Sequence, residues 1–307
     1  MASRSKKPAR RAASRKLRRV LVATDFRAGS AFAYSRVSAL PLSSRAEVLL
    51  VGVRPVKRSQ GRRTLRRWRE NLARAALRLE SQLAGTHPRV RIEPVLLAGR
   101  AAPQINALAQ DREVDLIVMG RHSRRPLADL LGIGGTAQKV MRRSDVPVLV
   151  ARRQERGPYR RPLLGYELPP GPATLRAIRE ARPMVSLKAR WTAVHVVDDL
   201  AGALRTVHVS ERHIASVRER QERELGRAVR HDLGKRAARV SWKVEIRFGD
   251  PATRLARAAE ERKADLVVVG THAHSDLGAR ILGSVAEAVL QRAPCDVLAV
   301  PPPITGR

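Results

Sequence analysis

The sequence is poor in aromatic residues and in cysteine, and these shortages limit what the protein can be. Phe, Trp and Tyr make up 3% of the 307 residues, so its cores have to be built from aliphatic side chains. A single cysteine, Cys295, excludes an internal disulfide and fits a reducing compartment. Because Cys295 adjoins a Val-rich stretch, we expect a buried structural thiol. No apolar run approaches the roughly 20 residues of a membrane helix, and we expect a cytoplasmic protein.

Acidic residues are scarce as well, and the formal net charge is +33. Residues 1–150 hold 32 Lys and Arg against 10 Asp and Glu, a net of +22, whereas residues 151–307 hold 29 against 18, a net of +11. A field this strong attracts polyanions such as nucleic acid, acidic proteins or anionic lipid. Composition leaves open the alternative that a high-GC genome simply encodes Arg freely.

The first residues form a basic tail with little that can be buried. Residues 1–17 contain no acidic side chain, and we expect them to be disordered. No apolar stretch follows, so the tail is not a secretory signal. Its composition leaves three interpretations open: an organelle transit peptide, an arm that binds nucleic acid, or a solvated tail without a partner.

The chain contains one series of motifs twice, about 150 residues apart. A repeat of this length indicates two copies of one domain rather than a solenoid, and a chain of this size suits two domains. We place the first domain at 18–151, a polar linker at 152–161 and the second domain at 162–303. The series runs Val114–Gly120, Gly134–Arg143 and Val148–Val150 in the first copy, and Ala264–Gly270, Gly283–Arg292 and Val297–Val300 in the second.

Apolar runs alternate with stretches of helical periodicity throughout. The apolar runs are continuous and do not alternate with polar residues. This pattern indicates strands buried on both faces of a parallel sheet flanked by helices. The predicted fold class is α/β, with two tandem doubly wound parallel sheets of five strands each, and ligands in such sheets bind outside the carboxyl ends of the strands. The expected strands are 19–25, 46–53, 90–97, 116–119 and 146–150, then 163–166, 193–197, 244–248, 266–269 and 297–300. The expected helices are 31–40, 62–84, 102–110, 174–181, 210–236 and 252–262.

Taken in order, four motifs resemble those of universal stress proteins, with two UspA-type domains in tandem. The motifs are Val22–Asp25, Gly249–Pro251, Ala264–Gly270, and Gly283–Glu287 followed by Ala293-Pro-Cys. The resemblance extends from Arg18 to about Pro301. It implies the adenine-nucleotide alpha-hydrolase-like fold, a role in the stress response, and ATP or a related adenine nucleotide as the ligand.

Nucleotide-binding members of that family use a loop of the form Gly-x2-Gly-x9-Gly-Ser/Thr. Glycines let backbone N–H groups approach phosphate oxygens, and the helix that follows adds donors and a favourable dipole. The second copy matches the spacing with Gly270, Ala273, Gly283 and Ser284, and departs only at Ala273. The resemblance also implies an aspartate that contacts the nucleoside at the end of the first strand, where the second copy has Glu167.

The first copy departs from the loop in another way. Ser123 replaces the second glycine, and the loop is one residue longer before Gly134, Gly135 and Thr136. Asp25 and Gly120 are present, and His122, Arg121, Arg124 and Arg125 add positive charge. Neither copy therefore holds a complete site. Two alternatives stay open: Asp25 caps a local turn, and Ser284 is a plain helix N-cap.

Other clusters give no stronger signal. His272 and His274 are too isolated to predict a metal site, His195 is expected to be a packed strand residue, and Asp198 and Asp199 a turn. No nucleophile elbow, P-loop or zinc pattern is present, so we expect a binding protein and not an enzyme. The alternative function is a polybasic scaffold, associated with nucleic acid or ribosomes, that has lost nucleotide binding. Its binding surface would be the basic tail and the Arg-rich helix at 62–84, with non-specific phosphate contacts.

The resemblance finally implies how the two copies are joined. Strands 146–150 and 297–300 are expected to pair the domains about a pseudo-twofold axis, which makes the chain pseudo-dimeric. Whether two chains also form a homodimer is left open by the sequence.

Overall fold

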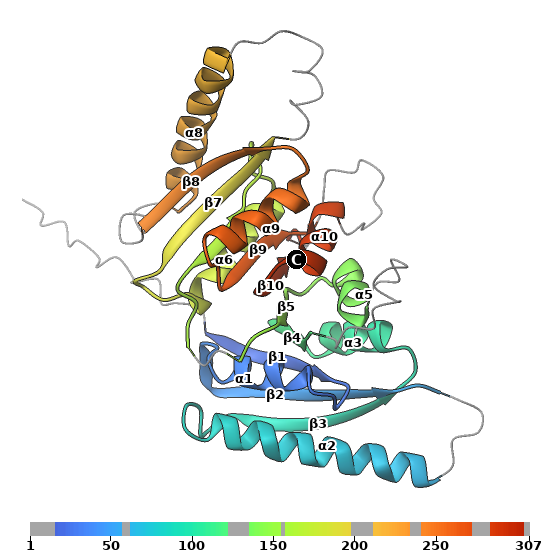
Figure 1. The fold of residues 1–307 in the computed structure, drawn as a ribbon. Helices are drawn as coiled ribbons and strands as arrows, with labels where there is room; N and C mark the ends of the chain where they lie inside the picture. The colour runs from blue at the N-terminus through green and yellow to red at the C-terminus, as the bar shows by residue number, and fades with distance from the viewer. Residues whose placement is uncertain are drawn as a thin grey trace, which may run out of the picture.

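The structure is a computed structural model that describes residues 16–56, 62–121, 135–154, 157–197, 211–233, 241–271 and 283–303. Both halves of the chain contribute to one ten-stranded sheet, flanked by helices (Figure 1). Its strand order is β3-β2-β1-β4-β5-β10-β9-β6-β7-β8. Among the described helices, none is long and apolar enough to cross a membrane.

The first half builds five parallel strands with helices between them. The apolar runs of β1, β2, β4 and β5 are buried, as expected for strands covered on both faces, whereas the edge strand β3 is only partly buried. The strands are β1 (Leu17–Thr24), β2 (Leu42–Arg54), β3 (Arg91–Ala98), β4 (Leu116–Gly120) and β5 (Val148–Ala151). The helices are α1 (Ser30–Val37), α2 (Arg62–Leu83), α3 (Ala101–Asp111) and α5 (Thr136–Arg143).

The second half repeats the same parallel topology. Its first strand is shorter than that of the first half but is central, pairing with strands on both sides. The strands are β6 (Pro162–Gly165), β7 (Arg190–Val197), β8 (Ser241–Phe248), β9 (Leu266–Gly270) and β10 (Asp296–Val300). The helices are α6 (Pro172–Ala181), α8 (Glu211–Leu233), α9 (Pro251–Glu261) and α10 (Ser284–Arg292), with a 3-10 turn at Arg182–Met184.

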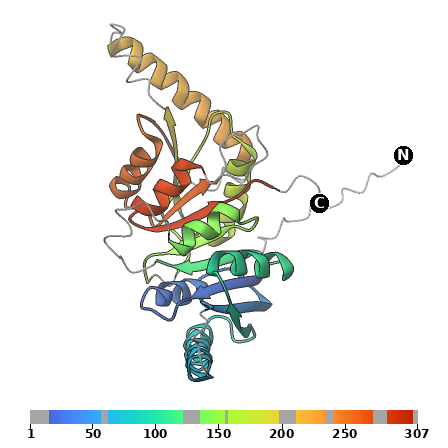
Figure 2. The same cartoon turned by 90° about the vertical axis from the view of Figure 1, so that its right-hand side faces the viewer.

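The two halves meet at an antiparallel pair of strands. In that pair Leu149 of β5 lies opposite Leu298 of β10. The two sheets therefore become one, with each half on its own side of the junction (Figures 1 and 2). The predicted α/β class and the pairing of the two copies through these strands are confirmed.

A buried polar cluster crosses the junction. Asp296 on β10 accepts hydrogen bonds from Arg36 Nε on α1 at 2.9 Å, from Tyr159 Oη at 2.8 Å and from Arg152 N at 2.7 Å. The Arg36 and Asp296 side chains are each 1% exposed, and the guanidinium lies 4.2 Å from the centroid of the Tyr159 ring. The linker thus supplies a fully buried aromatic residue, which its polar composition did not suggest.

Some predicted boundaries differ from the structure for local reasons. The helix expected at 31–40 ends at Val37, because the chain turns there. The strand expected from Val146 begins at Val148, since the Ser144 hydroxyl accepts from Val146 N at 3.1 Å and holds a turn. β2 begins at Leu42, four residues before the expected start at 46.

The core is mainly aliphatic, as predicted, and Cys295 is part of it. Its side chain is fully buried, and burial raises the pKa of its thiol to about 12. Because the thiolate is the reactive form, we expect no alkylation of the folded protein by iodoacetamide at pH 8, and complete alkylation in denaturant. Mass spectrometry after timed quenching measures this. Labelling of the native protein as fast as that of the unfolded chain would contradict the buried position.

Candidate functional site

The strand order places a switch point in each half. The chain runs outward from β1 through β2 to β3 and then returns to the other side of β1 as β4, so the crevice opens between the carboxyl ends of β1 and β4. The corresponding place in the second half lies between β6 and β9. Asp25 follows β1 directly and Gly120 ends β4, whereas Gly270 ends β9. The predicted residues of the strand ends are thus brought to the switch points.

Strand register identifies the residue of the second copy that is equivalent to Asp25. Val20 of β1 lies opposite Leu116, and Pro162 of β6 lies opposite Leu266, which holds the same place in the repeated motif. Five residues beyond Val20 and Pro162 stand Asp25 and Glu167. Glu167 is therefore the structural counterpart of Asp25, and its side chain is exposed.

The carboxylate of Asp25 organises a tight turn. Its Oδ1 accepts from Arg27 N at 3.0 Å and from Ser30 Oγ at 2.9 Å. The side chain keeps an exposed fraction of 38%. The interpretation of Asp25 as a local turn cap is confirmed, and the exposed carboxylate still faces solvent at the switch point.

Both glycines that end the fourth strand of their copy have a packing reason. A Cβ on Gly120 would lie 1.9 Å from the carbonyl oxygen of Gly29, so the turn before α1 crosses the end of β4 at backbone contact. A Cβ on Gly270 would lie 2.9 Å from Cβ of Ala173, near the start of α6. The motif links these glycines to phosphate alone, but packing within the protein also requires them, against backbone at Gly120 and against the Ala173 side chain at Gly270.

The start of α10 is the described part of the second loop. Gly283 N donates to Thr271 O at 2.6 Å, which ties the helix start to the end of β9. Gly283 is the N-cap and Ser284 is the first helical residue, exposed to solvent. The alternative of Ser284 as the N-cap is therefore wrong. Residues 272–282, with Ala273, His272 and His274, lie outside the described part.

The first copy lacks a hydroxyl at the matching position. Val148 and Val297 are equivalent in register, and 13 residues before them stand Gly135 and Ser284. Gly135 is the N-cap of α5, and Thr136 comes one residue later. A Cβ on Gly135 would meet nothing within 4 Å, so the glycine is not required by packing. Residues 122–134, with His122, Ser123, Arg124, Arg125 and Gly134, lie outside the described ranges.

The first turns of α5 and α10 contact each other across the junction. Glu287 accepts a hydrogen bond from Gln138 Nε2 and one from Arg142 Nη2, the latter at 2.9 Å. Gln138 and Glu287 occupy equivalent positions of the two copies, so this contact lies at the pseudo-twofold axis. The two candidate phosphate sites therefore stand on adjoining helices, and Arg142 compensates the charge of Glu287.

The motif Gly249-Asp-Pro251 starts a helix. Gly249 has a φ of +112°, which favours glycine, and Asp250 is the N-cap of α9, with Oδ1 accepting from Thr253 N at 2.9 Å. The hydrogen bond from the Thr253 side chain lowers the pKa of Asp250. This diagnostic motif is thus structural in this chain.

Two further histidine and acid predictions concern the second copy. His195 on β7 is half-buried, and its Nδ1 lies 2.9 Å from Tyr166 O, which confirms a packed strand residue. Asp198 and Asp199 lie outside the part that the structure describes. Within that part, no group of three or more His, Cys, Asp or Glu residues is placed to hold a metal.

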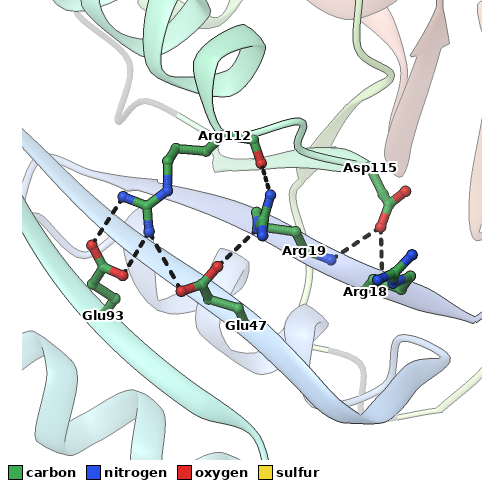
Figure 3. A network of polar contacts seen from close by, with 6 residues as sticks. All are labelled: Arg18, Arg19, Glu47, Glu93, Arg112 and Asp115. Atoms are coloured by element: carbon green, nitrogen blue, oxygen red, sulfur yellow. Dashed lines mark hydrogen bonds and ion pairs between the residues drawn. The ribbon is translucent and has the colours of Figure 1, made fainter.

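Ion pairs join residues near the amino ends of the strands, on the side of the sheet opposite the switch points. Arg112 contacts Glu93 at 2.7 Å and Glu47 at 3.4 Å, and Glu47 also pairs with Arg19 (Figure 3). Asp115 accepts from the backbone N–H groups of Arg18 and Arg19. In the second half Asp265 likewise accepts from Arg160 N and Arg161 N. An aspartate thus stands just before the fourth strand of each half, and in both halves it holds the backbone at or just before the start of the first strand.

A cavity of about 590 Å³ also lies at the amino ends of β4 and β5. It is lined by α3, the turn at 144–147, and Arg176 and Glu180 of α6. Arg176 is engaged there, donating to Asp145 O at 3.3 Å and to Pro302 O at 2.9 Å. The cavity is remote from the switch points and is part of the contact between the two halves.

Comparison with known proteins agrees with this architecture. The sequence pattern of the universal stress protein family matches residues 16–152 and again residues 159–301. A universal stress protein of Methanothermobacter thermautotrophicus is 31% identical over 110 residues, which cover 36% of this chain and 75% of that protein. A second curated relative, from Methanocaldococcus jannaschii, is 44% identical over 64 residues, and the match spans 38% of its length.

Solved structures show the same two-domain arrangement. A universal stress protein from Archaeoglobus fulgidus superposes with a TM-score of 0.66 at 18% identity, over 92% of this chain and 96% of that one. One from Pseudomonas aeruginosa, described as a putative universal stress protein, gives a TM-score of 0.58 at 16% identity over 94% of both chains. Fold and repeat thus define a tandem, doubly wound α/β protein. The chain belongs to the universal stress protein family and carries two of its domains.

Proposed function

We propose that this chain is a stress-response protein that binds ATP or a related adenine nucleotide at the switch point of its second copy. The observation that carries the proposal is the exposed start of α10, where Gly283 and Ser284 stand beside the end of β9. The first N–H groups of a helix have no partner within the helix, and with the helix dipole they bind phosphate well.

Each residue of the proposed site has its own role. The Ser284 hydroxyl and the N–H groups of the first turn bind phosphate oxygens, while Gly270 and Ala273 shape the loop between. Glu167 stands at the nucleoside end, since it occupies the place of Asp25. The first copy, with Asp25, Gly120, Gly134, Gly135 and Thr136, is a weaker second site, because Gly135 supplies no hydroxyl.

We propose that the site binds the nucleotide and does not turn it over. The sequence has no P-loop lysine to act on a β- or γ-phosphate. Ser284 and Glu167 are exposed polar side chains at the second switch point and are suited to hydrogen bonding of a ligand. We therefore place the chain among binding proteins of the family.

Calorimetric titration with ATP tests the site. Gly283→Asp is expected to abolish binding, because it places a negative charge at the phosphates without straining a backbone of φ −58°. Ser284→Ala is expected to weaken binding about 10- to 100-fold, as for one hydrogen bond to a charged group. The matched comparison is Gly135→Asp, which has open space in the first copy and is expected to remove only the weaker site, leaving the affinity of the second copy unchanged.

The same titration distinguishes a pocket from a polycation. It is run at about 0.15 M and 0.5 M salt with GTP and tripolyphosphate as comparison ligands, because exposed charge pairs are screened within about 8 Å at physiological salt. ATP-selective heat that survives high salt supports the pocket. Heat that vanishes with salt, or is equal with tripolyphosphate, contradicts it, and loss with Gly135→Asp alone would place the site in the first copy.

A further inference from the structure

The helix α2 carries a concentrated positive charge on its solvent side. Its 22 residues hold seven arginines, no lysine and two acidic residues, Glu70 and Glu80. All seven arginines are exposed, and Arg66 pairs with Glu70 at 3.5 Å. The seven are Arg62, Arg63, Arg66, Arg67, Arg69, Arg74 and Arg78.

Four of these arginines form a strip along the side opposite the core. The apolar side of α2 is buried through residues such as Leu72 and Leu79. At 100° per residue, Arg63, Arg67 and Arg74 fall on the other side, and Arg78 continues the strip. With a rise of 1.5 Å per residue the strip is about 22 Å long.

The fold does not demand this charge, as the equivalent helix of the second copy shows. α8 occupies the same place between the second and third strands of its half. Its six arginines are accompanied by five acidic residues, and ion pairs join Arg220 to Glu224 at 3.2 Å and Arg223 to Glu219 at 3.5 Å. Acidic residues therefore balance most of the positive charge of α8, whereas α2 stays strongly basic.

We propose that the solvent side of α2 binds the phosphate backbone of double-stranded nucleic acid. Guanidinium groups present two parallel N–H donors to a phosphate, which suits arginine better than lysine for this contact. α2 covers the edge strand β3 at the outer end of the first half, and in both views no other drawn helix lies beyond it (Figures 1 and 2). A long rod-like polyanion can thus lie along the strip.

The same residues favour a duplex over a membrane or a single strand. A helix that binds lipid buries its apolar side in the interface, but the apolar side of α2 is already packed on the protein core. Base stacking needs an exposed aromatic side chain, and Trp68 is half-buried, packing edge to face on Phe26 at 5.3 Å. Phosphate contacts remain, and these are sequence-independent and salt-dependent.

Two charge-matched variants of the full chain test the surface. One carries Arg63→Gln, Arg67→Gln, Arg74→Gln and Arg78→Gln on α2. The control carries Arg220→Gln, Arg223→Gln, Arg227→Gln and Arg230→Gln on α8. Affinity for a labelled duplex of about 20 base pairs is measured by fluorescence anisotropy across salt concentrations, with thermal unfolding as the check of folding.

The α2 variant is expected to bind at least about tenfold more weakly at 0.1 M salt. Its slope of log K against log salt is expected to be shallower by about 3 to 4, since each phosphate contact contributes about 0.9. The α8 variant is expected to match the wild type. Equal losses in both variants would reduce the effect to net charge and overturn the proposal.

Two more arms separate other sources of binding. Deletion of residues 1–15 is expected to leave the contrast between the α2 and α8 variants intact; disappearance of that contrast overturns the proposal. Vesicles containing phosphatidylserine are expected to bind both variants alike, and vesicle binding that depends on α2 while duplex binding does not would assign the surface to membranes. The α2 changes are expected to leave the calorimetric binding of ATP unchanged, because α2 and the nucleotide site at α10 are separate. A negative result for one proposal therefore does not contradict the other.

Discussion

Asp296→Ala is expected to lower the free energy of unfolding by about 3–5 kcal/mol. The substitution leaves the guanidinium of Arg36 buried without its counter-charge, and removing one partner of a buried ion pair costs about that much. It also removes the acceptor of Tyr159 Oη and of Arg152 N. Urea denaturation followed by circular dichroism measures the change. A loss below about 1 kcal/mol would contradict the buried pair.

The matched control is the second ion pair across the junction. Glu287 is 25% exposed and Arg142 is 53% exposed, so Glu287→Ala is expected to cost no more than about 1 kcal/mol. The double variant Arg36→Met with Asp296→Leu is expected to recover part of the lost stability, because an apolar pair requires no desolvation of charge. A double variant less stable than Asp296→Ala would show that the Arg36 and Tyr159 contacts depend on more than Asp296.

This cluster also shows where prediction from sequence ends. Strands and helices were predicted because apolar runs and helical periodicity are local signals, and the repeat supplied the two-domain arrangement. Arg36 and Asp296 lie 260 residues apart, in a chain with 61 basic and 28 acidic residues. Nothing local selects that pair among the many possible ones. Likewise, a tyrosine in a basic linker gives no sign that it is buried against both halves.

Some features of the candidate site could likewise be predicted from the sequence, and others could not. The strand-end position of Asp25 and the equivalence of Glu167 follow from the repeat, and the register bears them out. The binding roles of the loop residues and the domain limits at 151 and 162 stay predictions. A glycine in a sequence shows that something approaches closely, but not whether a phosphate or the protein's own backbone does so.

Gly120→Ala is the sharpest test of that distinction, and we expect it to lower the free energy of unfolding by about 3 kcal/mol. Overpacking costs about 1–3 kcal/mol, occasionally more, and here the added Cβ would lie 1.9 Å from Gly29 O and 2.6 Å from its carbonyl carbon. The contact is with backbone, so no flexible side chain can move aside. Relief requires a shift of the turn that Asp25 organises.

Two glycines of the same series provide the scale for this effect. Gly270→Ala is expected to cost only about 1 kcal/mol, since its Cβ would meet the Cβ of Ala173 at 2.9 Å. Gly135→Ala is expected to be neutral or stabilising by up to about 1 kcal/mol, because it meets nothing within 4 Å at a φ of −59°. The three variants are compared by urea denaturation. An order in which Gly120→Ala costs no more than Gly270→Ala would contradict backbone contact at the end of β4, and would return Gly120 to a role in ligand binding alone.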